Sequence, residues 1–204
     1  MKELFIDIET APLYATIGEY PKASRDKLIH KYDDQAYQKA GLHAEFARIV
    51  CISCGYMKGD EVVTKTYHGS ESELLTQLGN GVGVGFKYIG HNIIDFDIPF
   101  IQRRIAINGI RIPQGLKTRG MKPWDLDNMM ADTMKMWSST AWNYRVSLNV
   151  LCEILGVPSP KDGIDGSMVG QAFYEGRIQE IIDYCERDVE ATARVYRILK
   201  DLGM

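Results

Sequence analysis

The sequence has few of the features that mark membrane, secreted or strongly charged proteins. No apolar run reaches the roughly 18 residues that a membrane-spanning helix needs. The first residues, Met1–Asp7, place acids in an apolar stretch and lack the hydrophobic region of a signal peptide. The net charge is −3, so composition alone does not indicate a nucleic-acid-binding protein, although a local basic surface remains compatible with it. We therefore expect a cytoplasmic protein with no membrane partner.

Cysteine is scarce, and the chain has only Cys51, Cys54, Cys152 and Cys185, which are expected to stay reduced in the cytoplasm. Cys51 and Cys54 form a C-x-x-C motif. A zinc site would need a second such pair, and a redox motif would lie where a strand meets a helix. This motif lies inside a β-rich run, which favours two buried strand cysteines.

The order of the expected elements indicates an α/β fold in a single domain over residues 1–204. We expect an irregular insertion with some helix at about 11–45, and a helix that begins after Ser70. Strands are expected at 3–9, 47–57, 61–67, 84–90 and 130–137, the second and third forming a hairpin. Further helices are expected at 95–108, 147–155, 166–175 and 178–202. This pattern predicts a mixed sheet with helices packed on it.

The last predicted helix carries one apolar stripe at helical spacing. Its members are Ile178, Ile181, Ile182, Cys185, Val189, Ala193, Tyr196 and Leu199. Tyr184 and Asp188 are four residues apart, so they lie on one face of this helix at the border of the stripe. Taken alone, this pair is also typical of an ordinary surface helix.

Two carboxylates stand two residues apart in the first strand. Asp7 and Glu9 point to the same face of a strand and are flanked by apolar Phe5, Ile6 and Ile8. Neighbouring carboxylates repel each other and resist burial, and a divalent metal ion would compensate them. The alternative is an edge strand with a solvated acidic face.

A second acidic segment covers Gly90–Pro99, where a strand is expected to lead into a helix. Asp95 and Asp97 fall in its first turn, and acids there also stabilise the positive end of a helix dipole. The spacing alone therefore leaves capping and metal binding open. Asp132 lies near the start of the strand expected at 130–137 and is interpreted as a solvated strand end, with support of the metal site as the alternative.

Taken in order, these segments resemble a known family. They read Asp-x-Glu-Thr at Asp7–Thr10, Asn-x-x-x-Phe-Asp-x-Pro at Asn92–Pro99, and Tyr-x-x-x-Asp at Tyr184–Asp188. The sequence resembles DEDD 3′–5′ exonucleases of the tyrosine subclass, and is most similar to the proofreading domain of family-B DNA polymerases and its stand-alone relatives. The resemblance extends to Arg48–Ile52 and Asp132–Trp137. It implies a ribonuclease-H-like mixed sheet flanked by helices.

The resemblance also implies roles for individual residues. Asp7, Glu9, Asp97 and Asp188 would hold two divalent ions, Mg²⁺ or Mn²⁺, for two-metal hydrolysis. Tyr184 would orient the attacking water. In the family pattern the functional acid follows the phenylalanine, which favours Asp97 over Asp95.

Several residues are expected to contact the substrate. By resemblance, Thr10, Asn92 and Phe96 would contact the terminal nucleotide. A stretch free of acids between Gln102 and Pro123 could hold phosphates without reading sequence. Its basic residues are Arg103, Arg104, Arg111, Lys117, Arg119 and Lys122. Trp124, Trp137 and Trp142 could stack on unpaired bases. The alternative is a solvated basic loop with core aromatic residues.

The expected function is the removal of nucleoside 5′-monophosphates from the 3′ end of nucleic acid, with single-stranded DNA as the favoured substrate. The chain has no room for polymerase domains, so any proofreading would serve a separate polymerase. One alternative is an RNA 3′-end trimming enzyme similar to ribonuclease D. Another is a nucleic-acid-binding module without catalysis, against which the complete set of acids argues.

Overall fold

A five-stranded mixed sheet forms the centre of the computed structural model, which describes residues 1–141, 143–159 and 163–204. The strands are β1 (Lys2–Pro12), β2 (Ala47–Lys58), β3 (Glu61–His68), β4 (Phe86–Gly90) and β5 (Met130–Asp132). Their order is β3-β2-β1-β4-β5. β2 is antiparallel to β1 and β3, whereas β4 is parallel to β1 and β5. The predicted hairpin is therefore present, and β1 lies in the middle of the sheet.

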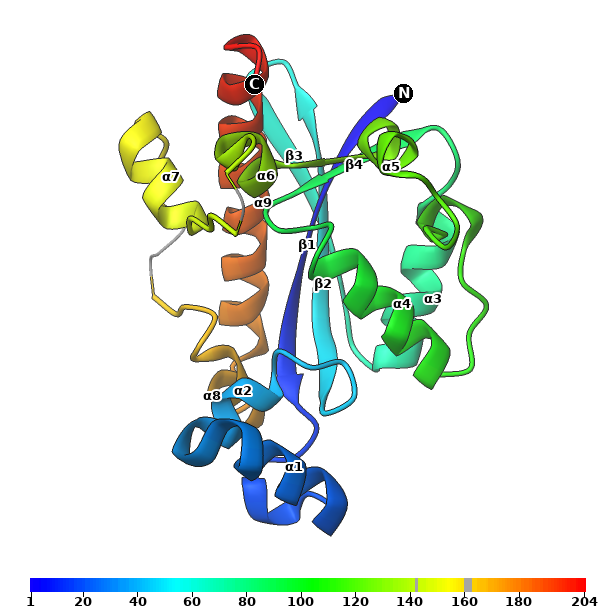
Figure 1. Ribbon diagram of the computed structural model, residues 1–204, viewed down its shortest axis with the longest axis vertical. Helices are drawn as coiled ribbons and strands as arrows, with labels where there is room; N and C mark the ends of the chain where they lie inside the picture. Colours follow the sequence, from blue (N-terminus) through cyan, green and yellow to red (C-terminus); the bar gives the residue numbers. More distant parts are fainter. Residues whose placement is uncertain (142, 160–162) are drawn as a thin grey trace.

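Helices cover both faces of this sheet (Figure 1). α3 (Glu71–Gly81) and α4 (Asp97–Ile107) pack on one face, and α9 (Ile178–Asp201) runs along the other. The remaining helices are α1 (Lys22–Tyr32), α2 (Ala36–Ala40), α5 (Pro123–Met129), α6 (Thr133–Ser138), α7 (Leu148–Leu155) and α8 (Val169–Tyr174). This confirms the predicted α/β class, a mixed sheet flanked by helices. Among the described residues, no helix is both long and apolar enough to span a bilayer.

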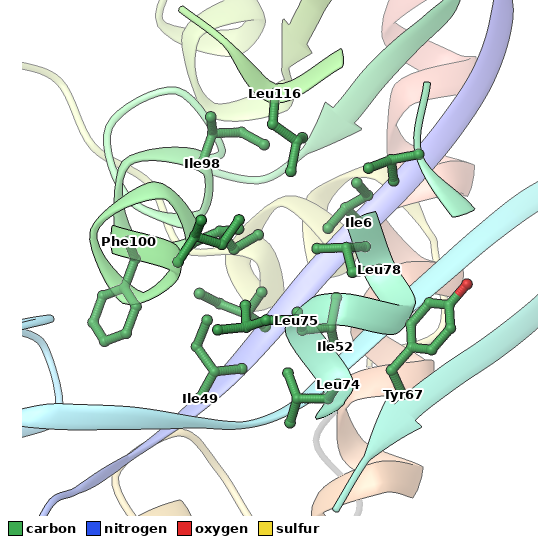
Figure 2. Packing of buried hydrophobic residues seen from close by; sticks show 14 of the residues in the cluster. Ile6, Ile49, Ile52, Tyr67, Leu74, Leu75, Leu78, Ile98, Phe100 and Leu116 are labelled. Atoms are coloured by element: carbon green, nitrogen blue, oxygen red, sulfur yellow. The ribbon is translucent and has the colours of Figure 1, made fainter. Parts of the chain in front are cut away.

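The two faces of β1 separate its apolar side chains from its acids. Ile6 and Ile8 belong to the buried cluster under α3 and α4, and Figure 2 shows Ile6 beside the buried leucines of α3. Asp7 and Glu9 alternate with them, so their side chains face the side where α9 packs. Alternate side chains of β1 therefore pack in the core on one face of the sheet, and the acids lie on the other face.

The long helix α9 buries the stripe predicted for it. Ile178 is partly buried, and the buried members are Ile181, Ile182, Cys185, Val189, Ala193, Tyr196 and Leu199. They pack against β1, β2 and neighbouring helices. This packing fixes the rotation of α9 and directs the border of the stripe toward the acidic face of β1.

Two strand ends differ from the prediction by three residues or more. β1 continues to Pro12 and does not stop at Thr10, because its pairing with β2 resumes beyond a bulge between Glu9 and Thr10. The strand predicted at 130–137 ends at Asp132, whose carboxylate accepts hydrogen bonds from the first turn of α6. An aspartate in this position satisfies backbone N–H groups that a helix leaves unpaired, and so favours a helix start.

The insertion at 11–45 is more helical than predicted. It contains 3-10 turns at Ile17–Glu19 and Asp33–Gln35 together with α1 and α2. A small apolar cluster is buried within it, formed by Tyr20, Leu28, Ala36 and Ala40. Figure 1 places the insertion at one end of the sheet, beside α8.

A buried ion pair joins α3, α4 and the end of the insertion. Arg104 donates to both carboxylate oxygens of Glu71, at 2.7 Å and 2.5 Å, and to the carbonyl oxygen of Ala44 at 2.8 Å. Glu71 also accepts the backbone N–H of Ile49 at 2.8 Å. Burial alone would raise the pKa of Glu71, but its hydrogen bonds, led by those from Arg104, lower it overall. The Arg104 and Glu71 side chains are only 6% and 12% exposed, so each charge depends on the other.

Replacing Arg104 should therefore destabilise the protein strongly. We expect Arg104→Ala to lower the free energy of unfolding by about 3–5 kcal/mol, because it leaves the Glu71 carboxylate buried without a partner. Urea denaturation would measure the change. Arg103→Ala is the matched control, since the neighbouring Arg103 is exposed and should change stability by less than about 0.5 kcal/mol. Equal stability of the two variants would contradict a structural role for the ion pair.

Candidate active site

Acids from three distant segments meet on the face of the sheet that α9 covers. Asp7 and Glu9 come from β1, Asp97 is the first residue of α4, and Asp188 comes from α9. Each of the other three acids contributes to the raised pKa of Glu9, which shows that the four charges are close neighbours. Asp97 is 3% exposed and Glu9 7% exposed. The geometry therefore brings together the four acids that the sequence singled out.

The electrostatics of this cluster disfavour four free carboxylates. Burial raises the pKa of Asp7 well above its usual value, and the charges of Asp188 and Asp97 raise it further. For Glu9 the causes are burial and then the charge of Asp7. Burial raises the pKa of Asp97 to about 7, although a hydrogen bond from the backbone of Ile8 acts in the opposite direction. A cation placed among these acids would relieve both the repulsion and the loss of hydration.

Tyr184 adjoins the acids from one helical turn before Asp188. Burial raises the pKa of its phenol, and the charge of Asp188 adds to this effect. The phenol is therefore protonated at neutral pH, and its hydroxyl makes a hydrogen bond to the Asp188 carboxylate. Tyr184 and Asp188 line a hollow of about 360 Å³ together with Ser147, Leu148, Asn149, Asp165, Gly166 and Ser167.

The prediction overlooked Cys185 as a neighbour of the acids. Its thiol donates a hydrogen bond to Asp7 Oδ2 at 3.3 Å, and the candidate ligand atoms of Asp7, Glu9 and Cys185 all lie within 4.8 Å of one another. Burial raises the pKa of this thiol, and a hydrogen bond with Cys51 adds to the shift. Its position three residues before Asp188 already puts it on the same helix face, so the spacing contained the signal.

The C-x-x-C motif consists of two buried strand cysteines, as predicted. Cys51 packs in the cluster under α8 and α9, whereas Cys54 packs in the cluster under α3 and α4. Residues three apart in a strand face opposite sides of the sheet. The two thiols therefore lie in separate apolar layers.

Asp132 is a buried positioning residue, which corrects its interpretation as a solvated strand end. It is 3% exposed. Its carboxylate accepts the backbone N–H groups of Asn92 at 2.9 Å and Ile94 at 3.2 Å, in addition to capping α6. Asn92 has a φ of 69°, so these bonds hold the loop before Asp97 in a conformation that few residues adopt freely.

The structure separates the roles of Asp95 and Asp97. Asp95 forms an ion pair with Lys135 at 3.0 Å, and both side chains are about half exposed, at 46% and 48%. Asp97 is directed into the acid cluster, where its pKa responds to Asp132 and Asp188. Asp95 is therefore a surface residue, in agreement with the preference for Asp97.

The residues expected at the substrate differ in their surroundings. Thr10 is partly exposed, and its hydroxyl donates to the carbonyl oxygen of Gly41 at 2.7 Å. Asn92 and Phe96 are also partly exposed, and the Phe96 ring lies 5.3 Å from that of Phe100. These three residues stay predictions as nucleotide contacts.

Arg104 was expected to contact the substrate, but its side chain is buried inside the protein. All three of its donor nitrogens are engaged by Glu71 and Ala44 inside the protein. The adjacent Arg103 is exposed on the same helix and remains a candidate for contacting a phosphate.

Two residues of the basic stretch after Gln102 lie away from the acids. Arg111 and Lys117 line a hollow with residues of α3, on the face of the sheet opposite α9. Trp124 is 59% exposed with Lys122 over its ring, whereas Trp137 is packed partly buried near α7 and α9. Trp142 lies outside the described residues.

The chain is similar to several known proteins in structure or in sequence. The family B DNA polymerase from the hyperthermophilic archaeon Pyrobaculum calidifontis superimposes with a TM-score of 0.60 at 13% identity, over 98% of this chain and 24% of the polymerase chain. A product-bound structure of exonuclease I gives 0.48 at 11% identity, over 93% of this chain and 45% of that one. An uncharacterized protein of Methanocaldococcus jannaschii is 27% identical over 127 residues, which are 58% of this chain and 66% of that protein.

The likeness to the polymerase shows the fold class, and a family model goes further. It matches residues 40–201 and is described as a predicted 3′–5′ exonuclease related to the exonuclease domain of PolB. The chain therefore belongs to this family of predicted 3′–5′ exonucleases. Asp97, Tyr184 and Asp188 lie within the matched segment, whereas Asp7 and Glu9 precede it.

The buried acids should make the stability of the metal-free protein depend on pH. A carboxyl whose pKa is raised by folding stabilises the folded state below its unfolded pKa, and this contribution is lost as the pH rises through the folded pKa. For Asp97 this contribution is lost between pH 3.8, the usual pKa of the carboxyl, and about 7, its pKa in the folded protein. In EDTA, we expect Asp97→Asn to raise Tm relative to the unmodified protein more at pH 8 than at pH 4.

Thermal unfolding of the two proteins at both pH values would measure this difference. The control is Asp95→Asn, which changes an exposed acid two residues away and should shift Tm only slightly at either pH value. A pH-independent shift for Asp97→Asn would show that Asp97 ionises freely in the folded protein.

Proposed function

We propose that this chain is a metal-dependent 3′–5′ exonuclease that hydrolyses the terminal phosphodiester of single-stranded DNA and releases nucleoside 5′-monophosphates. The observation that carries the proposal is the convergence of Asp7, Glu9, Asp97 and Asp188 beside Tyr184, with burial and mutual repulsion raising the pKa of the acids. Membership of a family of predicted 3′–5′ exonucleases supports it.

The donor set fits divalent metal ions. Carboxylate oxygens are the ligands that Mg²⁺ and Mn²⁺ prefer. The oxygens of Asp7 and Glu9 are close enough to share an ion, and Asp97 and Asp188 add negative charge beside them. We propose that the four acids hold two ions. When bound, such ions lower the pKa of a coordinated water and stabilise the leaving 3′-oxygen.

The chain itself would position the attacking water through Tyr184. The phenol hydroxyl is hydrogen-bonded to Asp188, and its high pKa keeps the proton on the phenol. Its oxygen therefore has a lone pair free to accept a hydrogen bond from the water, which would fix the direction of attack. Thr10, Asn92 and Phe96 would hold the terminal nucleotide, and Arg103 would contact a phosphate farther along the strand.

Two alternatives use the same site differently. An RNA 3′-end trimming enzyme would need the same acids, because the metal chemistry does not distinguish deoxyribose from ribose. A binding module without catalysis would need no converging acids at all, so the buried cluster favours an enzyme.

The first test is degradation of a 5′-labelled single-stranded DNA oligomer. With Mg²⁺ or Mn²⁺ we expect a ladder of products that shorten from the 3′ end. EDTA and Asp7→Ala should abolish it, because each removes metal from the site. Asp95→Asn should keep it, because that acid lies at the surface. Faster digestion of a matched RNA would favour the trimming enzyme, and binding without digestion of either oligomer would favour the module.

A second test separates metal binding from water positioning. We expect Asp188→Ala to reduce kcat by about 10³-fold or more, since it removes a metal ligand worth several kcal/mol of transition-state stabilisation. Tyr184→Phe should reduce kcat by about 10- to 100-fold, as expected for a group that orients a reactant near the metal. Steady-state kinetics on the same oligomer would measure both. Equal losses would overturn the separate roles assigned to these side chains.

A further inference from the structure

A cavity of about 490 Å³ opens between the insertion and α8, next to the acid cluster. The insertion contributes one wall through α2 and its neighbours, and the segment from Gly166 to Glu175 contributes the other. Its size is within the range of roughly 300–1,000 Å³ that holds small organic ligands. The residues that line it are Thr10, Pro12, Ala15, Tyr37, Gln38, Gly41, Leu42, Gly166, Ser167, Gly170, Gln171, Tyr174 and Glu175.

This cavity shares part of its wall with the hollow beside Tyr184 and Asp188. Thr10 directly follows Glu9 in β1, and Gly166 and Ser167 line both the cavity and the hollow that contains Tyr184 and Asp188. A Cβ atom added at Gly166 would lie 4.0 Å from the Tyr184 hydroxyl oxygen. A strand with its 3′ end at the acids could therefore place one of its bases in the cavity.

The lining suits a base better than a phosphate. Tyr37 and Tyr174 supply aromatic surface, and Gln38 supplies an amide that can both donate and accept hydrogen bonds. The Gln171 amide nitrogen donates to Glu175 at 2.7 Å, which leaves its oxygen to accept a hydrogen bond from a base. Lysine and arginine are missing from the described lining, and the Glu175 carboxylate is paired with Arg177 at 2.8 Å. Aromatic side chains stack on unpaired bases, and amide groups pair with the polar edges of bases.

Hydrogen bonds fix the walls of the cavity to β1. The Tyr174 hydroxyl donates to the carbonyl oxygen of Pro12 at 2.8 Å, and the Thr10 hydroxyl donates to that of Gly41 at 2.7 Å. Gly170 packs against Pro12 so closely that an added Cβ would lie 2.9 Å from the proline ring. The cavity is therefore preformed, which lowers the entropy lost when a ligand binds.

We infer that this cavity binds one unpaired nucleobase of the substrate strand, and that Gln38 and Gln171 give the enzyme a preference among bases. The inference rests on the proposed exonuclease function, because that function supplies the strand. It assigns the insertion a role in substrate selection, separate from the chemistry carried out at the acids.

The test combines variants of the cavity with oligomers that lack one base. Gln38→Ala and Gln171→Ala remove the amides, and Gln35→Ala is the matched control, an exposed glutamine of the same insertion outside the cavity. Binding of fluorescent single-stranded DNA is measured by anisotropy in EDTA, so that hydrolysis does not contribute. The oligomers are intact or carry a single abasic residue at one of the first four positions from the 3′ end.

We expect the combined Gln38→Ala and Gln171→Ala variant to bind the intact oligomer about five- to hundredfold more weakly, as expected for loss of two amide hydrogen bonds to one base. Gln35→Ala should bind normally. At one abasic position the unmodified protein and the combined variant should bind equally, because the base that the cavity would hold is missing. The inference would be overturned if the unmodified protein still bound more tightly than the combined variant at every abasic position. It would also be overturned if the two proteins bound the intact oligomer equally.

Hydrolysis with Mg²⁺ distinguishes this failure from failure of the proposed function. If the combined variant digests the oligomer normally and binds it as tightly as the unmodified protein does, the base site is disproved. The exonuclease function would be unaffected by that result. Binding that depends on one base and on the two glutamines, without any digestion, would support the base site and overturn the exonuclease. Relative rates on the four homopolymers should also differ for the unmodified protein and become more alike in the combined variant.

Discussion

Repulsion among buried carboxylates is the constraint on which the rest of this structure depends. Beyond burial, the charges of Asp188 and Asp97 make the ionisation of Asp7 less favourable, and the charges of Asp7, Asp188 and Asp97 do the same for Glu9. The surrounding fold must supply the free energy that holds them together. β1 is fixed between β2 and β4, and apolar layers on both faces of the sheet fix α4 and α9 against it. The stability of the core thus maintains an arrangement that would be unfavourable without a counter-charge.

The sequence predicted correctly which way side chains point where the periodicity of a single strand or helix determines it. The spacing of two places Asp7 and Glu9 on one face of β1, and the apolar stripe fixes which side of α9 meets the sheet. The α/β class and the hairpin followed from the same patterns. Each of these features is local, so no knowledge of distant contacts was needed.

The failures concern residues whose roles depend on distant partners. Arg103 and Arg104 are adjacent in a basic stretch, and only the position of Glu71 on another helix shows which of them is buried. Asp132 was interpreted as solvated because its partners, Asn92 and Ile94, belong to a loop some 40 residues earlier in the chain. The basic stretch likewise suggested a phosphate track, whereas the fold places Arg111 and Lys117 over α3.

The small apolar cluster inside the insertion has a consequence for how such a protein can diversify. Tyr20, Leu28, Ala36 and Ala40 pack largely with other residues of the same segment, so the acids do not depend on them for support. Sequence changes that keep this cluster can reshape the outer surface of the insertion while the acidic face of β1 stays intact. The fold therefore separates a segment whose outer surface can vary from the strand that carries the acids.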